Sequence, residues 1–208
     1  MTNVLIIDSA ATGDASVSRR LTGELEAILR GRGPVRIVRR DVGATPVPHL
    51  SAETTPAIRG AEAATEIARD AVALSDELIA ELKAADLIVI GAPMYNFGMA
   101  STLKAWFDHV LRAGITFRYS EAGPEGLVTG KKAIVVESRA GLYSTGPAAA
   151  MDSQEPHLRT LLGFMGITEI AFVRAEKLAF GPEAAAASIA EAIEALRSLA
   201  AEELPLAA

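Results

Sequence analysis

Hydrophobic residues along the chain follow two patterns, short unbroken apolar runs and longer stretches in which apolar residues recur every three or four positions. The short runs are typical of strands that are buried on both faces of a parallel sheet. The longer stretches predict amphipathic helices that cover such a sheet. Five runs of the first kind occur, at Val4–Asp8, Val35–Val38, Leu87–Ile90, Ala133–Val136 and Ile170–Val173.

Helical patterns separate these runs, so strands and helices alternate along the chain. The helical stretches are Leu21–Leu29, Ala64–Ala85, Leu103–Val110, His157–Met165 and Ala184–Glu203. This alternation predicts an α/β fold, a doubly wound five-stranded parallel sheet with strand order 2-1-3-4-5 and helices on both faces. No internal repeat or interdomain linker interrupts it, and we expect one domain over residues 1–208.

Composition excludes several classes of function. The chain has no cysteine, which rules out disulfides, thiolate catalysis and cysteine-ligated metals, and its three histidines are not at metal-ligand spacing. We therefore expect no metal site. The net charge of -6 argues against nucleic acid as a partner, and the apolar runs are too short to span a membrane. The N-terminal segment lacks the features of a signal peptide, so we expect a cytoplasmic protein.

The stretch Leu87–Asp108 organises the candidate site, because a strand, a loop and a helix follow one another in it. Pro93 ends the strand, since it has no N–H for the ladder. The loop then presents Met94, Tyr95, Asn96 and Phe97. Two aromatic rings and a thioether around one amide favour a seat for a flat, partly polar ring. The alternative is that these aromatic residues only pack under the edge of the sheet.

Another loop, SAATGDASVS, follows the first strand and leads into a helix that begins near Ser16 and Ser18. Free N–H groups and the helix dipole make such a helix start a site for a phosphate, to which serine hydroxyls add donors. The alternative is a simple N-cap, for which serine is also preferred. The loop has neither the GxGxxG pattern nor a Walker P-loop, so dinucleotide and triphosphatase folds lose their main support.

A third loop, Ser138–Tyr143, follows the fourth strand and consists largely of small residues, so that backbone can approach a ligand. With strand order 2-1-3-4-5, the strands before these three loops are neighbours, and ligands bind beyond the carboxyl ends of such strands. Anion donors, an aromatic seat and small-residue backbone would then meet in one crevice. Flavin mononucleotide (FMN) fits this combination.

Two further segments are irregular. Residues 49–64 form a long excursion that contains Arg59, which is either solvated or in contact with substrate or cofactor. The glycine-rich segment ITFRYSEAGPEGLVTGKK carries Phe117 and Tyr119 and fits either a hairpin or a lid. The aromatic residues Phe117, Tyr119 and Phe164 exceed what an isolated site needs, which favours an interface between subunits.

Four segments resemble the FMN-dependent NADH-azoreductases of bacteria, which belong to the flavodoxin-like NAD(P)H:quinone oxidoreductases. They are IDSAATGDASVSRRL, APMYNFGMASTLKAWFDHVLRAGITFRY, GPEGLVTGKKAIVVESRAG and LGFMGI. The resemblance extends from Met1 to about Pro182. It implies a flavodoxin-like homodimer with one tightly bound FMN per subunit and sites at the dimer interface. It also implies NADH as electron donor, quinones or aromatic azo compounds as acceptors, and a ping-pong course.

The resemblance also assigns roles to residues. Ser16, Val17 and Ser18 would hold the FMN phosphate. The remaining contacts would come from two loops, with ribityl and ring cradled by Met94, Tyr95, Asn96 and Phe97, and the polar edge of the ring lined by Ser138, Arg139, Ala140 and Gly141. A substrate pocket is expected from Arg59, Phe117, Tyr119 and Phe164, and no catalytic residue besides the flavin.

The sequence departs from the family pattern at Ala10, where the family usually has a serine, and at Ala140, where it usually has a glycine. These changes remove one possible phosphate donor and add a methyl group near the ring. Backbone N–H groups remain at both places, so we still expect FMN to bind. The alternatives to an oxidoreductase are a flavodoxin-like one-electron carrier and a regulator or binding module without enzymatic activity on the same fold.

Overall fold

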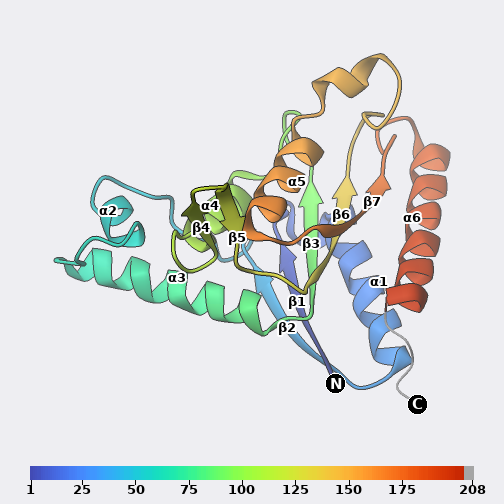
Figure 1. Ribbon diagram of the computed structural model, residues 1–208. Coiled ribbons are helices and arrows are strands. Elements are labelled where there is room, and N and C mark those ends of the chain that lie inside the picture. The colour runs from blue at the N-terminus through green and yellow to red at the C-terminus, as the bar shows by residue number, and fades with distance from the viewer. Residues whose placement is uncertain (204–208) are drawn as a thin grey trace.

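A five-stranded parallel sheet runs through the molecule, between two layers of helices (Figure 1). The computed structural model describes residues 1–203. The strand order is β2-β1-β3-β6-β7. Counted within this sheet alone, that is the predicted order 2-1-3-4-5. The strands are β1 (Thr2–Asp8), β2 (Val35–Asp41), β3 (Leu87–Pro93), β6 (Lys132–Ser138) and β7 (Glu169–Ala175).

The central strands are buried along most of their length, as their unbroken apolar runs predict. Every residue of β3 is buried, and so are the last five of β1. The strand β2 lies at one edge and is partly exposed. In the register of the sheet, Asp8 pairs with Gly91 and Pro93 with Ser138. The carboxyl ends of β1, β3 and β6 therefore lie at the same edge.

Helices cover both faces, and each face has its own core. On one face, α1 (Val17–Arg32) and α6 (Pro182–Glu203) pack with their leucine and alanine residues on the sheet. The other face carries α3 (Glu66–Ala84), α4 (Ser101–Val110) and α5 (Gln154–Met165). Its core contains the fully buried Trp106 and Phe107. The five predicted helices are thus confirmed.

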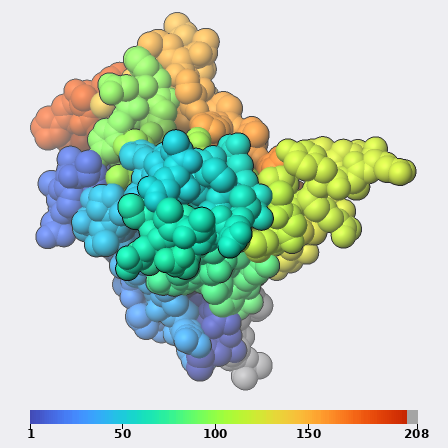
Figure 2. Space-filling model, turned by 90° about the vertical axis from the view of Figure 1, so that its left-hand side faces the viewer, coloured from blue at the N-terminus to red at the C-terminus, as the bar shows by residue number. Residues whose placement is uncertain are grey.

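The irregular segments contain short elements. The glycine-rich segment is a hairpin of β4 (Phe117–Ser120) and β5 (Gly123–Gly126), one of the two structures that its sequence fits. It projects from the body of the molecule in Figure 2, where it is yellow-green. The remaining short elements are η1 (Gly13–Ala15), α2 (Thr54–Ile58) and η2 (Pro147–Met151).

One helix departs from its predicted packing. The periodicity of residues 64–85 places Ile67 on the buried face, but the side chain is 59% exposed. The N-terminal turns of α3 extend beyond the sheet (Figure 1), and there the neighbouring Ala68 is buried in place of Ile67. Among residues 1–203, no helix is both long and apolar enough to cross a membrane.

Candidate functional site

Three loops at the carboxyl edge of the sheet lie next to one another, through hydrogen bonds and through the contact of the Phe97 and Tyr143 rings. We call them the β1 loop (residues 9–16), the β3 loop (residues 94–100) and the β6 loop (residues 139–146). The Met94 N–H donates to the Ser138 carbonyl at 2.9 Å, and the Ala11 N–H donates to the Tyr95 hydroxyl at 3.1 Å. The sequence-based expectation that these loops meet in one place is therefore confirmed.

The β1 loop ends at the start of α1, where Ser16 caps the helix. Its hydroxyl accepts from the Arg19 N–H at 3.3 Å and lies 3.1 Å from the Ser18 hydroxyl. The first N–H groups of a helix have no partner within it, so those of Val17 and Ser18 are available. Capping and anion binding are thus compatible at this helix start, since different groups serve them.

Two other residues of the β1 loop have structural roles. The Ser9 hydroxyl donates to the Gly91 carbonyl at 2.7 Å, which ties the loop to β3. Ala10 is 1% exposed, and the backbone of the segment after β2 lies on it. A Cβ at Gly43 would come within 2.2 Å of the Ala10 carbonyl, so only glycine allows this approach.

The β3 loop contains a tight turn whose tip is strained. The backbones of Tyr95 and Gly98 exchange two hydrogen bonds, at 2.9 and 3.1 Å. The two residues between them, Asn96 and Phe97, both have positive φ, 49° and 71°. A bulky residue rarely adopts this conformation, and such strain clusters at functional sites. The turn leaves both side chains exposed, while Met94 and Tyr95 are half-buried.

The β6 loop offers hydrogen-bond donors rather than acceptors. The carbonyls of Arg139, Ala140 and Gly141 accept from the N–H groups of residues 177–179, at 2.8 to 3.2 Å. The N–H groups of Ala140 and Gly141, in contrast, have no hydrogen-bond partner within residues 1–203. The Ala140 side chain is exposed, so its methyl group causes no crowding within the chain. Two amides of this loop are therefore available to a ligand.

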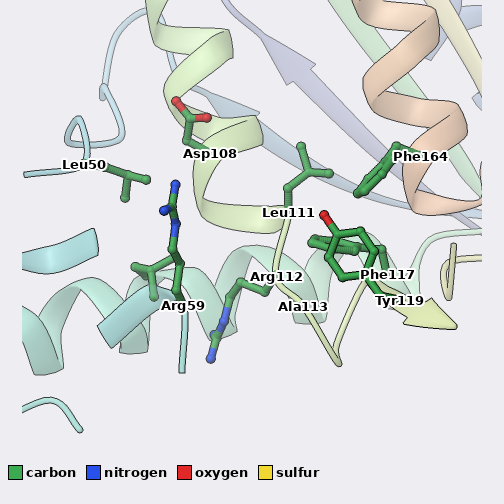
Figure 3. A pocket seen from close by; sticks show the side chains of 10 residues that line it. Leu50, Arg59, Asp108, Leu111, Arg112, Ala113, Phe117, Tyr119 and Phe164 are labelled. Carbon is green, nitrogen blue, oxygen red and sulfur yellow. The ribbon is translucent and has the colours of Figure 1, made fainter. Parts of the chain in front are cut away.

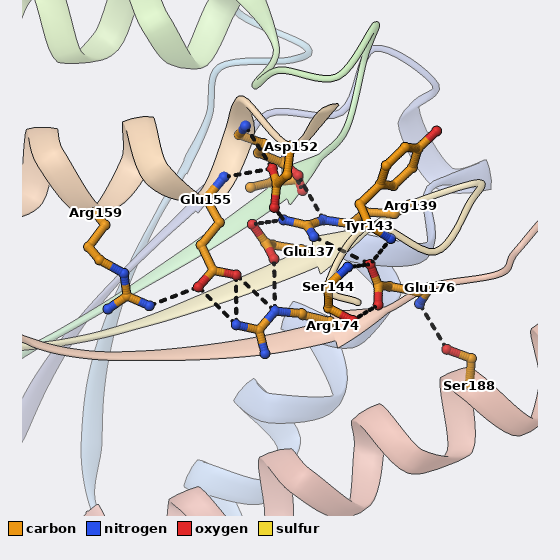
Figure 4. Close-up of polar contacts among 12 residues, drawn as sticks. Glu137, Arg139, Tyr143, Ser144, Asp152, Glu155, Arg159, Arg174, Glu176 and Ser188 are labelled. Atoms are coloured by element: carbon orange, nitrogen blue, oxygen red, sulfur yellow. Dashed lines mark hydrogen bonds and ion pairs between the residues drawn. The ribbon is translucent and has the colours of Figure 1, made fainter. Parts of the chain in front are cut away.

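The Arg139 side chain is not exposed at this edge of the sheet. It is fully buried below the loop in a charge cluster with Glu137, Asp152 and Glu176 (Figure 4). The distances from its guanidinium to these carboxylates are 2.7, 3.1 and 3.3 Å. The backbone N–H of Arg139 is also occupied, since it donates to the Ala175 carbonyl. Arg139 can therefore affect a ligand only through the shape that it gives the loop.

The charge cluster contains more acid than its arginine can neutralise. Burial raises the pKa of Glu137 to about 8, and the Arg139 charge offsets only part of this effect, because Glu155 and Asp152 oppose it. Glu176 behaves differently. Burial opposes its ionisation, yet hydrogen bonds from Ser144 and Tyr143 lower its pKa overall. At neutral pH the cluster therefore keeps a proton on Glu137 and a charge on Glu176.

The four residues expected in a substrate pocket do lie together. Arg59, Phe117, Tyr119 and Phe164 line one cavity of about 420 Å³ (Figure 3). The Phe117 ring lies 4.6 Å from Phe164 and 5.6 Å from Tyr119, between centroids. Asp108 and Arg112 add charge to the rim. The walls are largely apolar, with polar groups at one side, which is typical of sites for small aromatic molecules.

This cavity and the three loops lie at opposite ends of α4. The helix starts next to the β1 loop, where the Thr102 hydroxyl is 3.5 Å from the Ser9 carbonyl, while the cavity is lined by Asp108 and Leu111. A helix of 10 residues is about 15 Å long. The structure thus separates the expected ring-binding residues from the expected substrate pocket within one chain.

Sequence reasoning missed two residues of the site. Tyr143 folds back on Gly141, where a Cβ would come within 2.9 Å of its ring, and its edge faces Phe97 at 6.0 Å. Glu176 directly follows β7 and binds the backbone of the β6 loop. The sequence does place Glu176 as a polar residue just beyond a strand end. It does not show what Glu176 binds, because its partners in the β6 loop are more than 30 positions away.

Comparison with known proteins agrees with this geometry. Residues 2–200 match the protein family described as having a flavodoxin-like fold. An FMN-dependent NADH:quinone oxidoreductase of Hyphomonas neptunium is 57% identical over 190 residues, 91% of each chain. A protein of the same name from Escherichia coli O6:K15:H31 is 48% identical, over 97% of this chain and all of that one.

Among solved structures, azoreductase from Bacillus anthracis superposes with a TM-score of 0.88 at 28% identity. The match covers 97% of this chain and all of that chain. Family match, identity and shape agree over nearly the whole length, and they agree with the resemblance noted in four segments of the sequence. The chain belongs to the family of proteins with the flavodoxin-like fold.

Proposed function

We propose that this protein is an FMN-dependent NADH:quinone oxidoreductase that also reduces aromatic azo compounds. The observation that carries the proposal is the meeting of three loops at one edge of the sheet, with complementary chemistry. The helix start at Ser16–Ser18 suits a phosphate, the β3 loop suits a flat ring, and the β6 loop offers two free amides. Relatives up to 57% identical bear that name.

FMN has the parts that these loops require, a phosphate, a flexible chain and a flat ring with a polar edge. We assign the phosphate to Ser16, Val17 and Ser18, because their hydroxyl and N–H groups are hydrogen-bond donors without negative charge. Met94, Tyr95, Asn96 and Phe97 then cradle the ribityl chain and the ring. Ser138 and the backbone of residues 139–141 lie along the polar edge.

The flavin supplies the redox chemistry, since it takes up a hydride from NADH and passes it to an acceptor. The chain contributes position and electrostatics. The free N–H groups of Ala140 and Gly141 can donate to the pyrimidine edge of the ring, where negative charge develops on reduction. The rings of Phe97 and Tyr143 bound the space in which donor and acceptor take turns.

We further propose that the protein is a homodimer in which each subunit helps to close the other's acceptor site. The support is the separation along α4, because a substrate pocket about one helix length from its own crevice cannot serve that crevice. Tyr119 is 73% exposed on a hairpin that projects from the body (Figure 2). A large exposed aromatic residue on such an arm is typical of an interface. NADH as donor favours a cytoplasmic location.

Reconstitution and kinetics test the function. Purified protein should take up one FMN per chain and oxidise NADH with quinones and azo dyes, giving parallel double-reciprocal lines. Ser18→Ala should weaken FMN binding about tenfold or more, because a hydrogen bond to a charged group contributes about 1.5–3 kcal/mol. The control is Ser198→Ala, an exposed serine on α6, which should bind FMN as the wild type does.

Three results would contradict the proposal. Protein that takes up no FMN would favour a binding module, and intersecting lines would indicate a ternary complex. A large one-electron signal during turnover would favour an electron carrier. For the dimer, the test is sedimentation, and a fully active monomer at micromolar concentration would refute it.

A further inference from the structure

Glu176 is bound to the backbone of the β6 loop from below. Its Oε1 accepts from the Tyr143 N–H at 2.8 Å and from the Ser144 N–H at 3.0 Å, while its Oε2 accepts from the Ser144 hydroxyl (Figure 4). The Glu176 N–H itself donates to the Ser188 hydroxyl on α6 at 2.9 Å. The residue therefore connects the loop, through its side chain, to the end of β7, and its backbone N–H adds a bond to α6.

Arg139 holds this carboxylate from the other side. Its guanidinium lies 3.3 Å from Glu176 Oε1, and it is itself fixed by Glu137, by Asp152 and by the Gln154 side chain at 3.1 Å. Glu176 is 7% exposed, so water does not compete for its oxygen atoms. The carboxylate thus has a single position, and the amides that bind it share that constraint.

The constraint reaches the part of the loop that faces the crevice. Glu176 binds the N–H groups of Tyr143 and Ser144, whereas those of Ala140 and Gly141, two to four positions earlier in the same loop, stay free. It also places the Tyr143 ring on Gly141 and next to Phe97. The side chains of Glu176 and Arg139 therefore act without touching the ligand.

We propose that Glu176 is a positioning residue that, held by Arg139, sets the shape of the β6 loop and through it the affinity and reduction potential of the flavin. This inference rests on the proposed function, because it concerns FMN at the same site. Donors at fixed positions stabilise the reduced ring more than donors that must be ordered on each turnover. Loss of the anchor therefore weakens binding and lowers the potential.

Two variants at the same position separate the anchor from mere stability. Glu176→Ala removes every acceptor, and it should weaken FMN binding at least tenfold and lower the midpoint potential. Glu176→Gln keeps an oxygen for the two backbone N–H groups, and its amide can donate to Ser144. This conservative variant should recover most of the affinity and potential, although it loses the charge that faces Arg139.

The matched control is Glu155→Ala, which removes a carboxylate bound to Arg159 and Arg174 in the same region but not to the β6 loop. It should lower the melting temperature while the FMN dissociation constant and the potential stay as in the wild type. The proposal is overturned if Glu176→Ala changes only the melting temperature, or if Glu155→Ala shifts FMN affinity and potential equally.

Amide hydrogen exchange in FMN-free protein measures how firmly Glu176 holds the β6 loop, independently of the flavin. The Tyr143 and Ser144 amides should exchange slowly in the wild type and in Glu176→Gln, and at least tenfold faster in Glu176→Ala. Equal exchange in all three would show that Glu176 does not hold the loop. A wild-type protein with slow exchange that takes up no FMN would instead refute the proposed function, and the flavin role with it.

Discussion

The β3 loop and the β6 loop lie side by side and hold their shapes by opposite means. The β3 loop closes on itself through two backbone hydrogen bonds between Tyr95 and Gly98, and its tip is strained at Asn96 and Phe97. The β6 loop has no such closure. It is held by Glu176 and Arg139, which come from strand ends more than 30 positions apart and are buried.

The difference separates two ways of presenting groups to a ligand. A short closed turn exposes side chains, and it can be changed residue by residue with little effect on the core. A loop held by buried charge exposes backbone, and its geometry depends on groups that the ligand never touches. Changes in the support of the β6 loop should therefore affect both the stability of the fold and ligand binding, whereas changes in the β3 loop should affect ligand binding alone.

The largest effect is expected from Arg139→Met. This change removes the one guanidinium shared by Glu137, Asp152 and Glu176, so these buried acids lose the positive charge that lies between them. Breaking a buried ion pair by removing one partner costs about 3–5 kcal/mol. The free energy of unfolding of FMN-free protein, measured with urea, should fall by that amount. A loss below about 1 kcal/mol would show that the cluster does not support the loop.

The next effect concerns pH. Burial raises the pKa of Glu137 to about 8 from an ordinary 4.5, so between these values the folded chain keeps a proton that the unfolded chain has lost. The free energy of unfolding therefore decreases as pH rises through this window, with a slope approaching about 1.4 kcal/mol per pH unit. Below pH 4.5 both states are protonated and the slope disappears.

Glu137→Gln isolates this contribution, because its amide resembles the protonated acid and does not titrate. Urea unfolding at pH 5.5, 6.5 and 7.5 should show that the variant loses less stability with rising pH than the wild type. The difference between the two proteins at each pH cancels the other titrating groups. A difference that stays constant over the three values would mean that Glu137 is ionised throughout.

The two loops also differ in how far the sequence predicted them. Strands, helices and the sheet order follow from apolar runs and their spacing, and the turn residues of the β3 loop are adjacent in the chain, as are Ser16 and Ser18. Local patterns carry such features. The position of the three loops was therefore predictable, while the ligand contacts of their residues stay a prediction.

The support of the β6 loop was not predictable in this way. Sequence reasoning placed Arg139 among the residues that line the ring, but its side chain is buried below the loop, and Glu176 was not considered. Their pairing depends on the register of β6 and β7, in which Ser138 faces Ala175. The exposure of Ile67 and the distance of the aromatic cavity from the three loops also depend on how distant elements pack, which the spacing of residues in the sequence does not show.

A smaller effect is expected in the β3 loop, from Asn96→Gly. Glycine adopts the positive φ of 49° without strain, so the turn and the stability of the fold should be kept. Only the amide is lost. If it binds the flavin, FMN affinity should fall about tenfold, the equivalent of about 1.4 kcal/mol, in a fluorescence titration. Unchanged affinity would show that the side chain is not used for binding.

The smallest effect is expected at the outer rim of the charge cluster, from Arg159→Lys. Arg159 binds Glu155 one helical turn away at 2.8 Å, and its guanidinium lies 4.5 Å from the centre of the Phe172 ring. The side chain is 53% exposed, however, so water screens the ion pair and lysine keeps the charge. The free energy of unfolding should change by less than about 0.5 kcal/mol. FMN affinity should stay the same, because Arg159 has no contact with the β6 loop. If the free energy of unfolding fell about as far as in Arg139→Met, exposed ion pairs as well as buried ones would determine the geometry of the β6 loop. The support of the β6 loop would then include residues at the surface.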